Sequence, residues 1–234
     1  MDIDVTFNFK RDTPKGKDPD KYSRTLRRYH RLLWSKRLPC GVFFDLNDTS
    51  PGHYLHHPSE DKDKEFSLSS DAVIPSFGKN PRIKTLIPES EVEAFNAIGY
   101  TIGGMMVFPA DKIAGKMTIN GARGFHPRIK DRFDLTLECV RRHYNNQESP
   151  LSDTLKRYAN FFNLFTDFRG YVDFFLLQDC VTISRYEVKI SRPFDNFRGS
   201  PVPGTADEYR AYRDDSVTFI NARNRRIRNA GDEA

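Results

Sequence analysis

The sequence predicts an α+β fold, in which one mixed or antiparallel sheet is covered by about four to five helices. In several short segments apolar and polar residues alternate, which is typical of strands with one buried face. In several longer segments apolar residues recur every three or four positions, which is typical of amphipathic helices. With 234 residues, of which 38% are hydrophobic, the chain is long enough to bury one sizeable core. We therefore expect a single domain over residues 1–234.

Strands are expected mainly in the first half of the chain. The alternation in residues 2–9 predicts an N-terminal strand. Two short runs, residues 41–46 and 64–70, predict strands on either side of a loop at 47–64. Because this loop is rich in Pro, Gly, His and Asp, we expect it to be mobile.

Three further segments have strand character or fit either element. Residues 98–110 predict a strand interrupted by Gly103-Gly104, where glycine permits a bulge or a close approach of another backbone. Residues 186–190 predict a last strand. The apolar run 170–181 fits a buried strand or a helix, and its spacing favours a helix.

Helices are expected where a capping residue precedes a helical period. Asp18-Pro19 and Ser149-Pro150 are both typical helix starts. Thr205 and Glu208 form the spacing of a capping box before the last helical period. The expected helices span residues 19–36, 132–144, 149–165 and, as a basic C-terminal helix, 205–229.

Several classes of protein are excluded by simple patterns. No run of about 18 apolar residues could cross a membrane, and the N-terminus lacks the basic-then-apolar order of a secretory signal. The cysteines at 40, 139 and 180 are isolated and odd in number, which indicates free thiols in a reducing compartment. We therefore expect a cytoplasmic protein without membrane contact, and no motif predicts a cofactor.

The first helix is unusually basic. Residues 21–37 contain Lys and Arg but no acidic residue, whereas the formal net charge of the whole chain is only +5. On a helical wheel the basic residues form a stripe opposite the apolar side. This stripe predicts contacts with the phosphates of RNA or DNA, and a merely solvated basic face is the alternative. The predicted nucleic-acid-binding residues are Lys21, Arg24, Arg28 and Arg31.

A second candidate site lies in the polar segment 118–134. Its glycines would let the backbone approach an anion, and its arginines would supply positive charge. The alternative is a hairpin-like turn at Asn120-Gly121, supported by ion pairs of Arg123 with Asp131 and Asp134. The predicted anion-binding residues, including one from a later segment, are Asn120, Arg123, Arg128 and Arg169.

If that segment belongs to an enzyme, Asp134 and His143 are the candidate acid and base. The sharper hypothesis is that Arg169 and Asp173 meet Arg123 and Asp134 in one pocket that accepts a phosphate-bearing substrate. The alternatives are an ordinary ion pair between Arg169 and Asp173, four residues apart, and a partly buried structural histidine at 143.

Two further histidine patterns carry less information. His53, His56 and His57 could contribute metal ligands beside a carboxylate, but a polar loop accounts for them without a metal, and we predict none. Arg24 and His30 have the spacing of helical RNA-cleaving domains, whereas the strands expected here do not fit those domains.

Several blocks of the sequence carry a resemblance. They are IGYTIGGMMVFP, INGARGF, DRFDLTLECVRRHY, FRGYVDFFLLQD and, near the start, TLRRYHRLLWSKRLP. Together they resemble an uncharacterised family of small bacterial intracellular proteins over most of the chain. The resemblance implies a bacterial or phage source and a single-domain unit, but no activity, cofactor or catalytic residue. His126 departs from the asparagine that the resemblance leads us to expect after INGARGF.

Two functional hypotheses follow. The first is a nucleic-acid or polyanion-binding protein of phage-defence or toxin type, which uses the basic first helix and the basic C-terminal helix. The second is an enzyme acting on a phosphate-bearing substrate such as a nucleotide or RNA, with its pocket at residues 118–134. An enzyme requires the pocket, whereas a binding protein requires only an exposed charged surface.

Overall fold

The computed structural model describes residues 3–48, 50, 52–62, 65–75, 81–191 and 194–232. Within these residues the chain is an α+β domain, as predicted, with much more helix than strand. The helices are α1 (Pro19–Tyr22), α2 (Arg24–Trp34), α3 (Pro81–Leu86), α4 (Glu89–Gly99), α5 (Ile119–Phe125), α6 (Phe133–Tyr144), α7 (Ser152–Arg157), α8 (Ala159–Asn163), α9 (Phe168–Phe174) and α10 (Ala206–Asp232). The strands are β1 (Lys36–Arg37), β2 (Phe43–Phe44), β3 (Leu55–His57), β4 (Phe66–Ala72) and β5 (Met105–Pro109).

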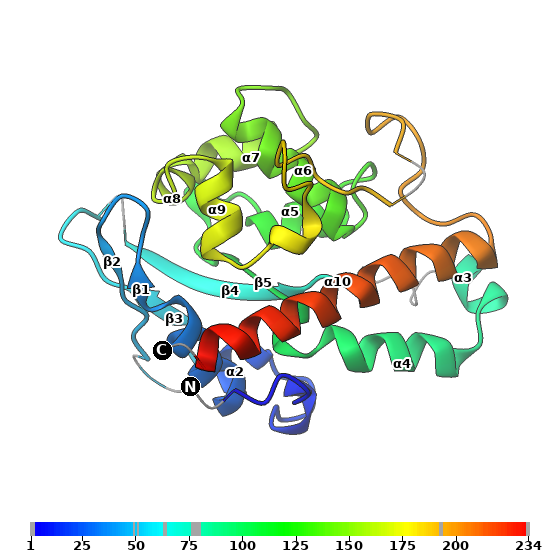
Figure 1. Cartoon of the computed structure of the whole chain (residues 1–234), viewed down its shortest axis with the longest axis horizontal. Helices are drawn as coiled ribbons and strands as arrows, with labels where there is room; N and C mark the ends of the chain where they lie inside the picture. Colours follow the sequence, from blue (N-terminus) through cyan, green and yellow to red (C-terminus); the bar gives the residue numbers. More distant parts are fainter. Residues whose placement is uncertain are drawn as a thin grey trace.

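Both sheets in the described part of the chain are antiparallel and small. Strand β4 lies between β3 and β5, with Leu68 opposite both Leu55 and Pro109. Strands β1 and β2 form a separate hairpin. In Figure 1, helices α5 to α9 gather on one side of β4 and β5, and α2 and α4 lie on the other side. Helix α10 packs against α4 and returns the C-terminus towards α2.

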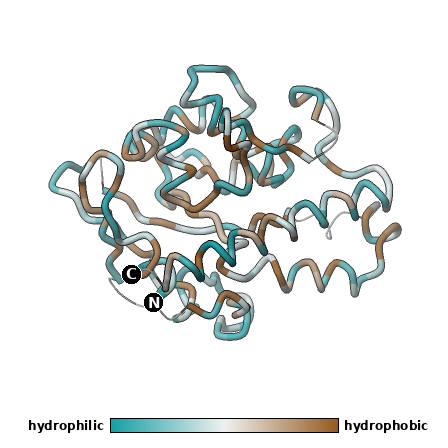
Figure 2. Tube along the Cα trace, viewed as in Figure 1, coloured by the Kyte–Doolittle hydropathy of each residue, from teal (hydrophilic) through white to brown (hydrophobic). Residues whose placement is uncertain are grey.

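Aromatic residues form much of the core. Trp34 of α2 packs against Phe174 and Phe175 at the end of α9, with ring centroids 6.1 and 5.3 Å apart. Phe165, after α8, and Tyr171 of α9 extend this cluster. Along α4 and α10 the colours of Figure 2 alternate between hydrophilic and hydrophobic, as expected for amphipathic helices. The basic helix α2 is therefore anchored to the core by its apolar side.

The predicted N-terminal strand is wrong for the described residues 3–9. The alternation does bury Ile3, Val5 and Phe9, but the chain forms turns and then a 3-10 helix at Phe9–Arg11. The reason is local, because the carboxylate of Asp4 accepts hydrogen bonds from the backbone and hydroxyl of Thr6. An alternating pattern thus marked a buried face without a neighbouring strand.

The predicted helix 19–36 is two helices joined at Ser23. The Ser23 hydroxyl accepts a hydrogen bond from the backbone of Leu26 and so caps α2, while its own hydrogen is donated to Asp12 at 2.5 Å. The predicted helix 149–165 is likewise divided at Tyr158 into α7 and α8. Ser149 does not cap α7, because α7 begins at Ser152 and Leu151 occupies the N-cap position.

Three other segments differ from the elements that the sequence predicts. Residues 118–134 are not a loop throughout, because Thr118 caps α5 by accepting from Gly121. Asn120-Gly121 therefore lies in a first helical turn and not in a hairpin. The segment 47–64 contains β3, so it is not loop throughout, and Val188 forms only an isolated bridge with Val181 in place of a last strand.

Candidate functional site

The basic stripe predicted for the first helix is present on α2. Arg24, Arg28 and Arg31 are exposed and follow one another by about one turn, while Leu26 and Leu33 are buried on the other side. Within the described part of the chain, none of these arginines forms an ion pair. The guanidinium of Arg28 lies over the ring of Tyr29, 5.0 Å from its centroid.

Two neighbouring basic residues behave differently. Lys21 belongs to α1, is half-buried, and places its ammonium 4.3 Å from the ring centroid of Tyr54. Arg27 is buried and donates to the carboxylate of Asp48 and to the backbone oxygen of Asp20 at 2.6 Å. Arg27 is thus a structural residue, which leaves three arginines as the open part of the stripe.

Two further arginines lie near Asp4. Arg228 near the end of α10 and Arg11 both lie close enough to Asp4 to lower its pKa, after the larger effect of its hydrogen bonds from Thr6. Figure 1 shows this end of α10 beside α2. Arginines from both ends of the chain therefore lie near Asp4, beside the end of α10 that Figure 1 shows next to α2.

Arg123, predicted to bind an anion, is instead a buried structural node with 1% of its surface exposed. One of its terminal nitrogens, Nη1, lies 2.6 Å from Asp71 of β4 and 2.7 Å from Asp131. Its Nε donates to Thr136 of α6 at 3.1 Å. The alternative of internal ion pairs is therefore what the structure has, although Asp71 replaces Asp134 as the second partner.

Asp134 belongs to a different network. Both oxygens accept from Arg132, and Oδ2 also accepts from the backbone of Ser191 at 3.0 Å. It borders a cavity of about 320 Å³ that Tyr212 also lines. His143 lies nine residues along α6, about 13 Å away and on the opposite side of the helix. The two residues cannot act as acid and base on one reacting atom.

His143 is half-buried beside the aromatic core. Its ring centroid lies 5.1 Å from that of Phe162. Burial, with a smaller effect of Lys156, lowers the pKa of His143. This environment matches the alternative of a partly buried structural histidine.

Arg169 is exposed and lies apart from Asp134, with which it was predicted to form one pocket. Its Nε is 3.6 Å from Asp173, and its guanidinium lies over the ring of Tyr186. It lines a shallow cleft of about 480 Å³ beside Pro39, separate from the cavity of Asp134. The hypothesis that Arg169 and Asp173 meet Arg123 and Asp134 in one pocket is wrong, because the chain places them in separate networks.

The other two predicted anion ligands also lie apart. Asn120 donates from its amide nitrogen to the hydroxyl of Ser69 at 3.1 Å, and it faces a polar cleft of about 440 Å³. Arg128 is exposed beyond the end of α5, and its backbone N–H donates to His126. Asp20 also lines the cleft beside Asn120. The sequence pattern did not indicate it, because acidic residues are common in the first turn of a helix.

The three histidines of the 47–64 segment have separate partners. His53 is bonded to Ser50, His56 to Glu65, and His57 to the backbone of Asp45. Among the residues that the structure describes, no three His, Cys, Asp or Glu side chains are grouped so that they could share a metal ion.

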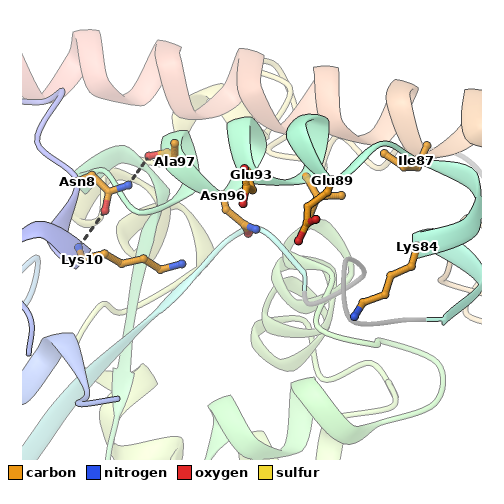
Figure 3. A pocket seen from close by; sticks show the side chains of 9 residues that line it. Asn8, Lys10, Lys84, Ile87, Glu89, Glu93, Asn96 and Ala97 are labelled. Carbon is orange, nitrogen blue, oxygen red and sulfur yellow. Dashed lines mark hydrogen bonds between the residues drawn. The ribbon is translucent and has the colours of Figure 1, made fainter. Parts of the chain in front are cut away.

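A larger cavity of about 620 Å³ runs along α4. Figure 3 shows Lys10 and Lys84 towards its two ends, with Glu89, Glu93 and Asn96 between them. Both glutamates are exposed. This groove is lined by side chains of opposite charge, but none of its polar side chains in the described part of the chain is buried. These residues therefore include no group that the fold fixes in position for catalysis.

Comparisons with known proteins place the chain in a family but do not indicate an activity. A family model described as "Family of unknown function (DUF6994)" matches residues 3–227. No curated protein and no solved structure matches the chain. Within the described residues, no helix is both long and apolar enough to cross a membrane.

Proposed function

We propose that this chain, which belongs to a family of unknown function, binds the phosphate backbone of RNA or DNA through α2. The observation that carries the proposal is the row of exposed arginines at 24, 28 and 31, without an ion-pair partner in the described part of the chain. Arginine offers several N–H donors in a planar fork, which suits phosphate oxygens.

Other arginines of the chain show why this row is informative. Arg27, Arg123 and Arg132 are buried and paired with carboxylates, and Arg223 donates to backbone oxygens. These side chains are used for folding. Arginines that are neither buried nor paired keep their donors available, and on α2 the apolar side holds them on one rigid surface.

The salt dependence of binding tests the proposal. At about 50 mM salt, short labelled single-stranded RNA and double-stranded DNA should bind, with affinity falling by ~0.7 to 0.9 log unit per log salt for each phosphate contact. In the triple variant Arg24→Gln, Arg28→Gln, Arg31→Gln the slope should flatten by about 2 to 3. Because all three side chains are exposed, the melting temperature should stay nearly unchanged.

A matched control removes the same charge elsewhere. Lys116, Arg185 and Arg198 are exposed and lie outside α2, so their replacement by Gln should leave most of the affinity and slope. Equal losses in the two triple variants would mean that only net charge matters. Absence of binding to any of these nucleic acids at about 50 mM salt would refute the proposal, because phosphate contacts are strong there.

An enzyme acting on phosphate at residues 118–134 is less well supported. The structure uses Arg123 and Asp134 in internal ion pairs, and His143 lies on the other side of α6 from Asp134. A phosphate clamp would require these groups to converge on one site.

We also place this binding in a bacterial cytoplasm, as part of phage defence or toxin action. The resemblance of the sequence to small bacterial intracellular proteins motivates this setting. Expression of the wild type and of the triple α2 variant in bacteria, with growth and phage plaques counted, tests it. No effect of the wild type on either readout would contradict the setting while leaving the binding proposal intact.

A further inference from the structure

A polar cleft of about 440 Å³ opens between α1, β4 and α5, away from the exposed arginines of α2. Carboxylates, hydroxyls and an amide converge on it from segments distant in sequence. Its polar lining includes Asp18, Asp20, Tyr54, Ser70, Asp71 and Asn120.

Asp20 is the most buried carboxylate of the cleft, with 5% of its surface exposed. It accepts hydrogen bonds from both the backbone and the hydroxyl of Ser70, at 2.8 and 2.6 Å. Burial raises the pKa of Asp20, whereas His30 and Ser70 favour its charged form. Burying a charged carboxylate costs free energy, so a position such as that of Asp20 indicates a role other than filling space in the core.

His30 lies behind the carboxylate of Asp20 and does not line the cleft itself. Its ring is buried, and its Nδ1 accepts a hydrogen bond from the indole of Trp34 at 3.1 Å. In the neutral ring the proton therefore resides on Nε2. This nitrogen points at Asp20 from 3.7 Å and makes no hydrogen bond to the described residues. Behind the cleft, Asp20 and His30 therefore lie close together without a hydrogen bond between their side chains.

Asp18 and Asn120 line the same cleft. Asp18 accepts from the hydroxyl of Tyr54 at 3.0 Å, and Asn120 donates through its nitrogen to Ser69. The amide oxygen of Asn120 is buried and out of reach of the cleft. The acceptors that line the cleft therefore include the carboxylates of Asp18 and Asp20, and a ligand that complements them must bring hydrogen-bond donors.

The charge of those donors follows from the surroundings. Asp18 and Asp20 both raise the pKa of the Tyr54 phenol, after the larger effect of burial, which indicates a negative potential. The ring of Tyr54 already attracts one ammonium group, since the Lys21 nitrogen lies 4.3 Å from its centroid. The described residues offer no grouping for a metal ion, which favours an organic cation.

We propose that this cleft binds a small ligand through a protonated primary amine. The ammonium N–H groups donate to the carboxylates of Asp18 and Asp20. The aliphatic part of the ligand lies against the ring of Tyr54. Lys112 is exposed and also lines the cleft, and its positive charge opposes a bound cation.

Calorimetric titration with putrescine and spermidine tests this site in the absence of nucleic acid. One saturable site is expected for each, whereas 1,4-butanediol, which lacks the charge, and tetramethylammonium, which lacks N–H donors, should not bind. Asp18→Asn should weaken amine binding on the order of tenfold, because a charged hydrogen bond becomes a neutral one. Asparagine also caps helices, so α1 should remain folded in this variant.

A matched control removes a carboxylate from the other groove. Glu93→Gln carries the same charge change at α4 and should leave amine affinity unchanged. Equal weakening in both variants, or no binding of either amine, would overturn the proposal. The triple Gln variant of α2 should bind the amines like the wild type, so failure here and failure of nucleic-acid binding are distinguishable.

Discussion

At the scale of single residues, buried arginines connect segments that are distant in the sequence. Arg123 connects β4, the segment after α5, and α6 through Asp71, Asp131 and Thr136. The pair with Asp131 could be predicted from the sequence, because eight residues separate the two. The pair with Asp71 could not, since it joins positions 52 residues apart that only the tertiary fold brings together.

We expect Arg123→Ala to lower the free energy of unfolding by about 3 to 5 kcal/mol, because it removes the buried guanidinium that Asp71 and Asp131 both contact. Urea denaturation measures this. Arg128→Ala is the matched control, since Arg128 is exposed and its loss should change stability by only about 0.5 kcal/mol. Equal effects of the two variants would show that the Arg123 network is not a stabilising node.

Glu138 is a residue whose burial a helical wheel does not reveal. On a wheel it falls opposite the apolar residues of α6, but the structure buries it, with hydrogen bonds from Arg141 at 2.7 and 2.9 Å and from Arg142 at 2.8 Å. The helical period identifies which residues share a face. It does not reveal that a second element, here the segment of Asn196 bonded to Arg142, covers the polar face.

At the scale of elements, Gly104 shows how glycine sets the connection between α4 and β5. The sequence predicted a bulge or a close backbone approach at Gly103-Gly104, and the close approach is what the structure has. A Cβ added at Gly104 would lie 2.2 Å from the carbonyl oxygen of Gly99. No side-chain movement relieves a clash with backbone, so β5 or the end of α4 must shift.

We therefore expect Gly104→Ala to destabilise the domain strongly, by more than about 3 kcal/mol, since β5 is the strand that pairs with β4. The midpoint of urea unfolding and the yield of folded protein measure this. Gly124→Ala is the control, because its added Cβ would meet only an ordinary contact at 3.9 Å. A Gly104→Ala protein as stable as the Gly124→Ala protein would contradict this reading of the turn.

The elements also show which local signals were reliable. The helix starting near residue 133 and the basic face of α2 follow from the helical period alone. Boundaries failed where a side chain interrupts a helix, as the Ser23 cap does, or where a cap starts one early, as Thr118 does. Short polar side chains such as those of Ser and Thr hydrogen-bond to nearby backbone and so compete with a continuous helix. The spacing of apolar residues does not reveal this competition.

At the scale of the whole molecule, the candidate sites differ in how far the sequence predicts them. The α2 surface depends on residues close together along one helix, so a wheel suffices. The cleft depends on Asp20, Ser70 and Asn120, which come from α1, β4 and α5. No pattern within one segment can reveal such a convergence, and for this reason the sequence identified only Asn120.

Burial also gives the whole fold a common response to acid. It lowers the pKa of His57, His126 and His143, which lie in separate regions of the chain. In the unfolded chain a histidine titrates near pH 6.5. Between that value and each lowered pKa the unfolded state binds more protons, so the free energy of unfolding falls as the pH falls.

Urea unfolding at about pH 7.5, 6.5 and 5.5 should therefore show a midpoint that decreases with acidification. His143→Gln should make the decrease smaller, because glutamine cannot take up a proton in the unfolded chain. Above about pH 7.5 imidazoles are neutral in both states, so there the variant and the wild type should differ by a constant amount. A wild-type midpoint that is flat or rises between pH 7.5 and 5.5 would contradict the argument, since only unequal proton binding by the two states can tilt it.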